Sequence, residues 1–146
     1  MHMIHRLELA DADHIVESAK AMAQQLSARV SIAVVDASGV LLSFRRLDGA
    51  SIASVETSAA KARTAALTGG DSAAAEQAIA SGRMALLSLQ AVLHQPCALM
   101  AGGLVLRYQD VVVGAIGVSG MTPDQDAAVA RAGIEAFALK DQDCSS

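Results

Sequence analysis

A stripe of polar side chains along one expected helix is the first feature of this sequence that could do chemistry. One ammonium and three hydroxyls recur at i, i+4, i+7 and i+11, which is one side of a helix: Thr57, Lys61, Thr64 and Thr68. In one interpretation Lys61 donates to the carboxylate of a ligand and the hydroxyls orient it. In the other, the stripe is a solvated face opposite an alanine face. If the stripe lines a pocket, Lys61→Ala should weaken binding at little cost to the helix.

A second candidate lies where an apolar run meets the start of a helix. Glycine recurs every third residue in the run 111–120, and an N-cap, an N1 proline and a capping-box partner follow it. The exposed amides of such a helix start favour an anion. Tight packing of a glycine-bearing strand against a helix would explain the same glycines. The residues concerned are Gly114, Gly117, Gly120, Thr122, Pro123 and Gln125.

Two further side chains could transfer a proton. His94 lies in a long irregular segment, where it could act as an acid, a base or a haem ligand, and Asp124 follows the N1 proline. The histidines form neither H-x-x-x-H nor H-E-x-x-H, so the sequence predicts no preformed metal site.

Two consecutive arginines end an expected strand. Because side chains alternate along a strand, Arg45 and Arg46 must point to opposite sides of the sheet, so one of them could face a pocket. The alternative is a surface salt bridge of these arginines with Asp48 or Glu56.

The elements that must position these residues follow from periodicity and turn residues. We expect a helix over 9–28, a hairpin of strands 30–36 and 40–45 with the first strand central, and a helix from the Ser51 cap to Gly69. That helix carries one apolar face: Ile52, Val55, Ala59, Ala62 and Ala66. We then expect a helix over 72–87 and a loop over 88–96. After the loop we expect a hairpin, with strand segments 98–100 and 104–107, a turn at 108–110 and a strand over 111–118, and finally a helix over 122–139.

This order predicts one α+β domain over residues 1–140, with an antiparallel sheet flanked by helices, and a flexible tail over 141–146. The length of 146 residues suits one hydrophobic core. A net charge of −4 and an aromatic content of 2% argue against binding to DNA or RNA.

The apolar runs are too short for a membrane span, and the two cysteines, Cys97 and Cys144, have neither disulfide-scaffold nor zinc-site spacing. We therefore expect a cytoplasmic protein with reduced thiols and no membrane partner.

Five segments carry a resemblance that covers residues 8–139. They are SIAVVDASG at 31–39, FRRLDGA at 44–50, KARTA at 61–65, the pair Gly102-Gly103, and VVGAIGVSG at 112–120. Their combination closely resembles the GlcG/HbpS haem-binding family, which also includes the C-terminal domain of PduO-type proteins. The resemblance implies a profilin-like or PAS-like fold, assembly into homo-oligomers and, as in some members, binding or degradation of haem.

The chain departs from the family pattern between Leu89 and Leu104, where no proline follows Gly102-Gly103. This segment would border the pocket. A haem there would use Lys61 and an arginine for its propionates, and its axial ligand would come from His94, Cys97, Met100 or Tyr108.

Two principal functions are therefore open. The first is a haem-binding or haem-handling protein. The second is an isomerase or lyase for a small carboxylated metabolite, in which Lys61 and the amides near Gly120 and Thr122 hold the anion and His94 or Asp124 moves a proton. In the first case haem is the ligand, and in the second no cofactor is needed. A third option is a structural oligomer that assists a neighbouring enzyme.

Overall fold

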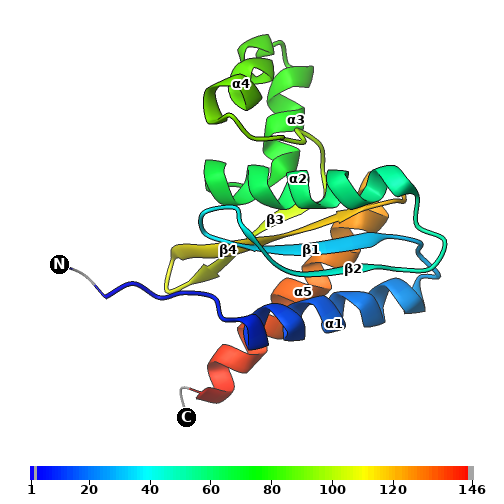
Figure 1. Cartoon of the computed structure of the whole chain (residues 1–146), viewed down its shortest axis with the longest axis vertical. Helices are drawn as coiled ribbons and strands as arrows, with labels where there is room; N and C mark the ends of the chain where they lie inside the picture. Colours follow the sequence, from blue (N-terminus) through cyan, green and yellow to red (C-terminus); the bar gives the residue numbers. More distant parts are fainter. Residues whose placement is uncertain (2, 145–146) are drawn as a thin grey trace.

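The computed structural model describes residue 1 and residues 3–144, and it arranges them as a sheet between two helical layers (Figure 1). Helices α1 and α5 cover one face of the sheet, and α2 covers the other. A small lobe stands on the far side of α2 and consists of α3, a 3-10 turn, α4 and the segment 94–102 that leads to β3 (Figure 1). The elements are α1 (Leu9–Gln25), β1 (Ser31–Asp36), β2 (Leu41–Arg46), α2 (Ile52–Thr68), α3 (Ser72–Ala80), the 3-10 turn (Met84–Ser88), α4 (Leu89–Leu93), β3 (Gly103–Tyr108), β4 (Val111–Ser119) and α5 (Pro123–Cys144). The predicted α+β class is confirmed.

The four strands are antiparallel and lie in the order β2-β1-β4-β3. Both predicted hairpins are confirmed, and β1 is an internal strand as expected. The carboxylate of Asp36 shapes the first turn by accepting from the amides of Ser38 and Val40 at 2.8 and 3.0 Å. Gln109 and Asp110 form the second turn, with φ of 49° and 63°. Two successive positive φ angles are the signature of a type I′ hairpin turn.

The two faces of the sheet carry side chains of different size. Ile32 and Ile116 point toward α1 and α5, where they join the main core with Ile15 and Val129. The opposite face carries smaller residues toward α2, including Ala115. The thick part of the core therefore lies between the sheet and the α1/α5 layer, while α2 approaches the sheet closely.

The apolar face predicted for α2 is only partly buried. Ala62 and Ala66 pack against the sheet as expected. Ile52 is 80% exposed, whereas Ser54 and Ser58 are buried against the sheet. The Ser54 hydroxyl lies 2.8 Å from that of Ser31 on β1. An added Cβ at Gly117 on β4 would overlap the carbonyl oxygen of Ser58. Helix α2 packs through small residues because the glycine in the sheet lets the two backbones approach.

Several predicted boundaries also change. Helix α1 ends at Gln25, three residues before the predicted end, because the chain reverses at Ser27 with φ of 52°. The helix predicted over 72–87 is interrupted at Gly82, whose φ is 101°.

The predicted loop over 88–96 contains α4, and residues 98–100 form no strand. Helix α5 extends to Cys144, so residues 141–144 of the predicted tail are helical. Residues 145 and 146 lie outside the described residues. Among the helices described, none combines the length and the apolar character needed to cross a bilayer.

Candidate functional site

Lys61 of α2 is buried between β4 and α5 and does not lie on an open face. Its Nζ donates to the carbonyl oxygen of Val118 at 2.9 Å and to Oδ2 of Asp126 at 3.2 Å. The side chains of Lys61 and Asp126 are 4% and 3% exposed. The solvated-face interpretation is therefore wrong for Lys61. The ammonium already has an anionic partner within the chain, and its assignment to a ligand stays a prediction.

The hydroxyls of the predicted stripe are also occupied within the helix. Those of Thr57, Thr64 and Thr68 each donate to a carbonyl oxygen one turn earlier, at 2.8, 2.8 and 2.6 Å. Thr64 additionally accepts from the amide of Ala98 at 3.0 Å, in a buried position. Thr64 thus attaches the segment before β3 to α2.

The backbone at Gly102 and Gly103 passes close to Lys61 of α2. Gly102 has φ of 119°, and its carbonyl oxygen accepts from the amide of Val118 at 2.9 Å. A Cβ at Gly103 would overlap the carbonyl oxygen of Lys61. The amide of Gly103 donates to the hydroxyl of Ser72 at 2.8 Å, and that hydroxyl donates to the carbonyl oxygen of Met100. Both glycines serve close packing here.

Side chains at the start of α5 accept from three nearby amides. Asp126 Oδ1 accepts from the amide of Met121 at 3.0 Å, and Thr122 Oγ1 accepts from the amide of Gln125 at 3.3 Å. Gln125 in turn accepts from the amide of Thr122 at 3.4 Å, which completes the expected capping box. Gly120 packs against the backbone of Arg29. An external anion at the amides of Met121, Thr122 or Gln125 would have to displace these acceptors. The ligand roles of Gly120 and Thr122 stay predictions.

The arrangement around Lys61 includes two residues that the sequence reasoning missed. Asp126 is 65 residues from Lys61, and no spacing rule connects them. Its place in the first turn of α5 was the available signal, since acidic residues are favoured there. Ser72, which the sequence places only at the start of a helix, links the lobe to β3.

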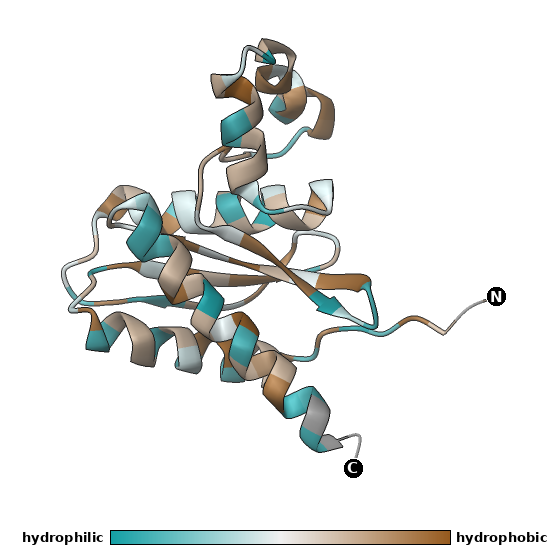
Figure 2. Cartoon of the chain, turned by 180° about the vertical axis from the view of Figure 1, so that it is seen from behind, coloured by the Kyte–Doolittle hydropathy of each residue, from teal (hydrophilic) through white to brown (hydrophobic). Residues whose placement is uncertain are grey.

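The lobe above α2 holds an apolar cavity. Its volume is about 400 Å³. None of the residues in the 3-10 turn or α4 is buried, and several large apolar side chains of the lobe are exposed. In Figure 2 the apolar residues of the lobe are the brown segments at the top of the molecule. The cavity is lined by Ile79, Leu87, Gln90, Cys97, Ala98, Leu99 and Met100.

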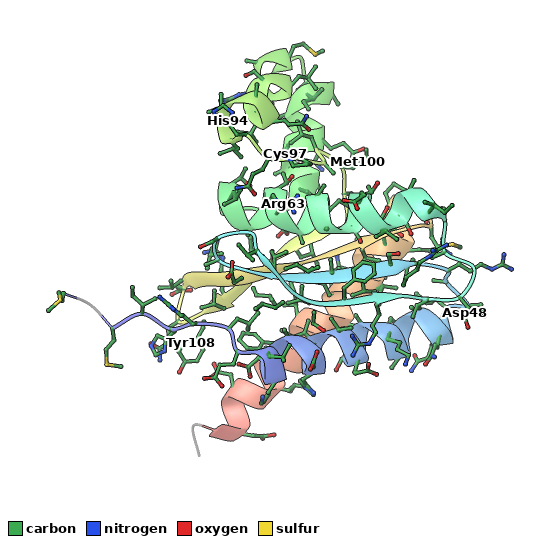
Figure 3. The ribbon with its side chains drawn as sticks, viewed as in Figure 1. Asp48, Arg63, His94, Cys97, Met100 and Tyr108 are labelled. Atoms are coloured by element: carbon green, nitrogen blue, oxygen red, sulfur yellow. The ribbon has the colours of Figure 1, made fainter. Side chains whose placement is uncertain are left out.

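Three of the four axial-ligand candidates belong to this lobe. Cys97 and Met100 line the cavity, whereas His94 ends α4 at the exposed outer side (Figure 3). Tyr108 lies at the other side of the molecule, 4.6 Å from the ring of His5 (Figure 3). Asp124 is exposed in the first turn of α5. The structure therefore does not group Asp124 with His94, which comes from the lobe.

Arg45 has a partner other than the two expected ones. Its Nε lies 3.3 Å from Oε1 of Glu17 on α1. Among the described residues neither Arg45 nor Arg46 forms an ion pair with Asp48 or Glu56, so the expected pairing is wrong. The partner comes from α1 because β2 lies beside that helix, which the local sequence around Arg45 does not reveal.

A smaller pocket of about 170 Å³ lies between the N-terminal segment and α5. Burial raises the pKa of Asp11 in its lining, but hydrogen bonds from Lys140 and from the amide of Glu8, with the charge of Lys140, outweigh this effect. The pKa of Asp11 is therefore lower than its usual value.

Comparisons with known proteins agree with this architecture. The chain is 31% identical over 134 residues to an uncharacterized 15.0 kDa protein in the dhaT-dhaS intergenic region of Citrobacter freundii, covering 92% of this chain and 94% of that protein. The crystal structure of Klebsiella pneumoniae ORFY matches with a TM-score of 0.82 and 28% identity, over 94% of this chain and 97% of that one. The crystal structure of a PduOC–haem complex matches with a TM-score of 0.82 and 27% identity, over 90% and 95%.

The model of the family described as haem-degrading protein HbpS-like matches residues 7–135. This match covers both hairpins, α2 and the lobe, and the resemblance noted in the sequence rests on the same segments. Because the family model spans well over half of the chain, the protein belongs to the HbpS-like family.

Proposed function

We propose that this protein binds haem and that the lobe cavity is the binding site. The observation that carries the proposal is an apolar cavity beside a 3-10 turn and a helix α4 that contain no buried residue, with a thiol and a thioether in its lining. Ligand sites are typically concave, largely apolar and roughly 300–1,000 Å³ in volume. The presence of haem in the PduOC complex supports haem as the class of ligand.

The residues present fit the main requirements of a haem. Ile79, Leu87 and Leu99 supply an apolar wall, and Cys97 or Met100 supplies a sulfur for the iron. A bound haem would supply a redox-active iron. Arg63 lies below Cys97 and donates to the carbonyl oxygen of Pro96 at 3.0 Å, so it is the cation we assign to a propionate (Figure 3).

The test is a titration with hemin, followed through the Soret band. A specific site should saturate at a fixed ratio of haem to chains, whereas surface adsorption should not. We expect Cys97→Ser or Met100→Leu to shift the band, because one of these sulfurs is the proposed axial ligand. Tyr108→Phe is the matched control, since Tyr108 lies away from the lobe.

Absence of saturation would refute haem binding. Saturation that is unchanged in Cys97→Ser and in Met100→Leu would refute the assignment to this cavity. In that event the variant His94→Ala tests the remaining axial-ligand candidate in the lobe. The imidazole of His94 does not line the cavity. The carboxylate enzyme remains the alternative if hemin fails to saturate while a small carboxylate raises the melting temperature.

We also propose that the chains associate through the lobe. Met84, Leu87 and Val92 are 57%, 58% and 69% exposed in a single chain, which is unusual for side chains of this kind gathered on one small lobe. Contact with a second copy would cover them. Light scattering at micromolar concentration should give at least the mass of a dimer, and a monomeric mass would refute this part of the proposal.

A further inference from the structure

A basic cleft lies between the end of α1 and the end of β2. Its volume is about 560 Å³. Its lining includes Lys20 of α1, Arg29 just before β1, Arg45 and Arg46 at the end of β2, and Asp48 in the following turn. Although Arg45 and Arg46 alternate along the strand, both border the cleft because it lies at the end of β2, which is an edge strand. Figure 3 shows Asp48 at the α1 side of the molecule, apart from His94 and Cys97 on the lobe. The cleft is therefore separate from the cavity assigned to haem.

The charge of this cleft is opposite to that of the whole chain. Four cations and one carboxylate line it, although the chain as a whole carries a net charge of −4. Like charges that share a cleft repel one another, and a bound anion removes that repulsion. The clustering therefore calls for a partner of negative charge.

The cations are only partly neutralised by the protein. Glu17 is shared by two of them, at 3.7 Å from Lys20 Nζ and 3.3 Å from Arg45 Nε. Within the described residues, neither Arg29 nor Arg46 has a carboxylate at ion-pair distance. A net positive charge thus remains after the internal pairs are counted.

The cleft is also held in shape by the backbone around it. Arg46 Nη2 donates to the carbonyl oxygen of Ala50 at 3.1 Å, and Arg45 Nη1 donates to that of Phe44 at 2.7 Å. The side chain of Arg29 lies against Gly49, where an added Cβ would approach its Cδ to 2.9 Å. These contacts restrict the arginine side chains before any ligand arrives, which lowers the entropy cost of binding.

The helix dipole alone does not account for the cluster. Helix α1 has no basic residue in its own last turn, so a neighbouring cation would help to stabilise its carbonyl end. That end corresponds to only about half an elementary charge, however. One cation would suffice for it, and the cleft presents four.

We propose that this cleft binds a small molecule that carries a doubly charged phosphate group. Guanidinium groups present forked donors that match the oxygens of phosphate, and two negative charges suit the two arginines without internal carboxylate partners. Free phosphate, diphosphate and phosphate monoesters share this chemistry.

The experiment is calorimetric titration at low ionic strength with inorganic phosphate, pyrophosphate and glycerol phosphate. The wild type should bind at least one of them at one site per chain, and the tightest probe identifies the form of phosphate preferred. In Arg29→Gln/Arg46→Gln the affinity should fall at least tenfold. In the control Arg83→Gln/Arg131→Gln, which removes the same charge from exposed positions elsewhere, it should change less than twofold.

A second variant tests whether a negative charge in the cleft weakens the binding of phosphate. Asp48→Asn removes the lining carboxylate, so it should tighten phosphate binding severalfold while the cations stay in place. No saturable binding of any probe by the wild type would overturn the proposal. Equal losses in the two double variants, or no gain in Asp48→Asn, would also overturn it.

Hemin titration of Arg29→Gln/Arg46→Gln distinguishes this cleft from the haem site. We expect hemin to saturate as in the wild type, because the altered residues do not line the lobe cavity. Loss of hemin saturation in this variant would overturn the separation of the two sites.

Discussion

Replacing Lys61 by methionine should lower the free energy of unfolding by about 3–5 kcal/mol, the cost typical of breaking a buried ion pair by removing one partner. The structure explains why this value applies. Methionine fills a similar volume, so little cavity is created. Oδ2 of Asp126 loses its cation, and the carbonyl oxygen of Val118 loses its donor. Both side chains of the pair are almost fully buried, so water cannot take the place of the ammonium.

The assay is urea unfolding, with Lys20→Met as the matched control. Lys20 Nζ lies 3.7 Å from Glu17 and its side chain is 35% exposed, so its loss should cost no more than about 1 kcal/mol. With an m value of about 2 kcal/mol/M, the midpoint of Lys61→Met should fall by roughly 1.5–2.5 M. A midpoint shift no larger than that of Lys20→Met would refute the reasoning.

A double variant tests the charge itself. Adding Asp126→Asn to Lys61→Met should recover about 1–2 kcal/mol, because the uncompensated carboxylate disappears and an acceptor for the Met121 amide remains. No recovery would mean that the pair does not act through its charges. The sequence expectation that Lys61→Ala leaves the fold intact assumed an exposed side chain, and the buried position reverses it.

The remaining predictions concern packing, one buried hydroxyl and pH. Gly117→Ala should lower the thermal midpoint by several degrees, because α2 must move away from β4, whereas Gly70→Ala, with nothing within 4 Å, should not. Thr64→Val should cost about 1–3 kcal/mol in urea unfolding and speed amide exchange of the segment before β3, since a buried amide loses its acceptor; unchanged exchange would contradict this. Because the pKa of Asp11 is lowered on folding, its contribution is present at neutral pH and lost as the pH falls below about 4. Asp11→Asn should therefore be less stable than the wild type at pH 7, by under about 1 kcal/mol given the exposure of Lys140, and the difference should shrink as the pH falls through the lowered pKa of Asp11.

The sequence by itself determined the elements that depend on local rules. The Asp36 turn and the two β-rich runs specified the first hairpin, and the Thr122–Gln125 capping box specified the start of α5. These features are predictable because each is decided by residues a few positions apart. Family membership was recognisable for a similar reason, since the motif segments are themselves local.

Only the tertiary structure decided how the elements face one another. Helix α2 turns Ser54 and Ser58 toward the sheet because Gly117 allows a close approach there. Ala62 and Ala66 of the predicted apolar face are buried with them, but Ile52 is left exposed. The same rotation buries Lys61, and the packing of α5 supplies Asp126 from 65 residues away. The lobe cavity and the basic cleft likewise combine residues from separate elements. Helical periodicity shows that a helix has faces, but the neighbour that packs against it determines which face is buried.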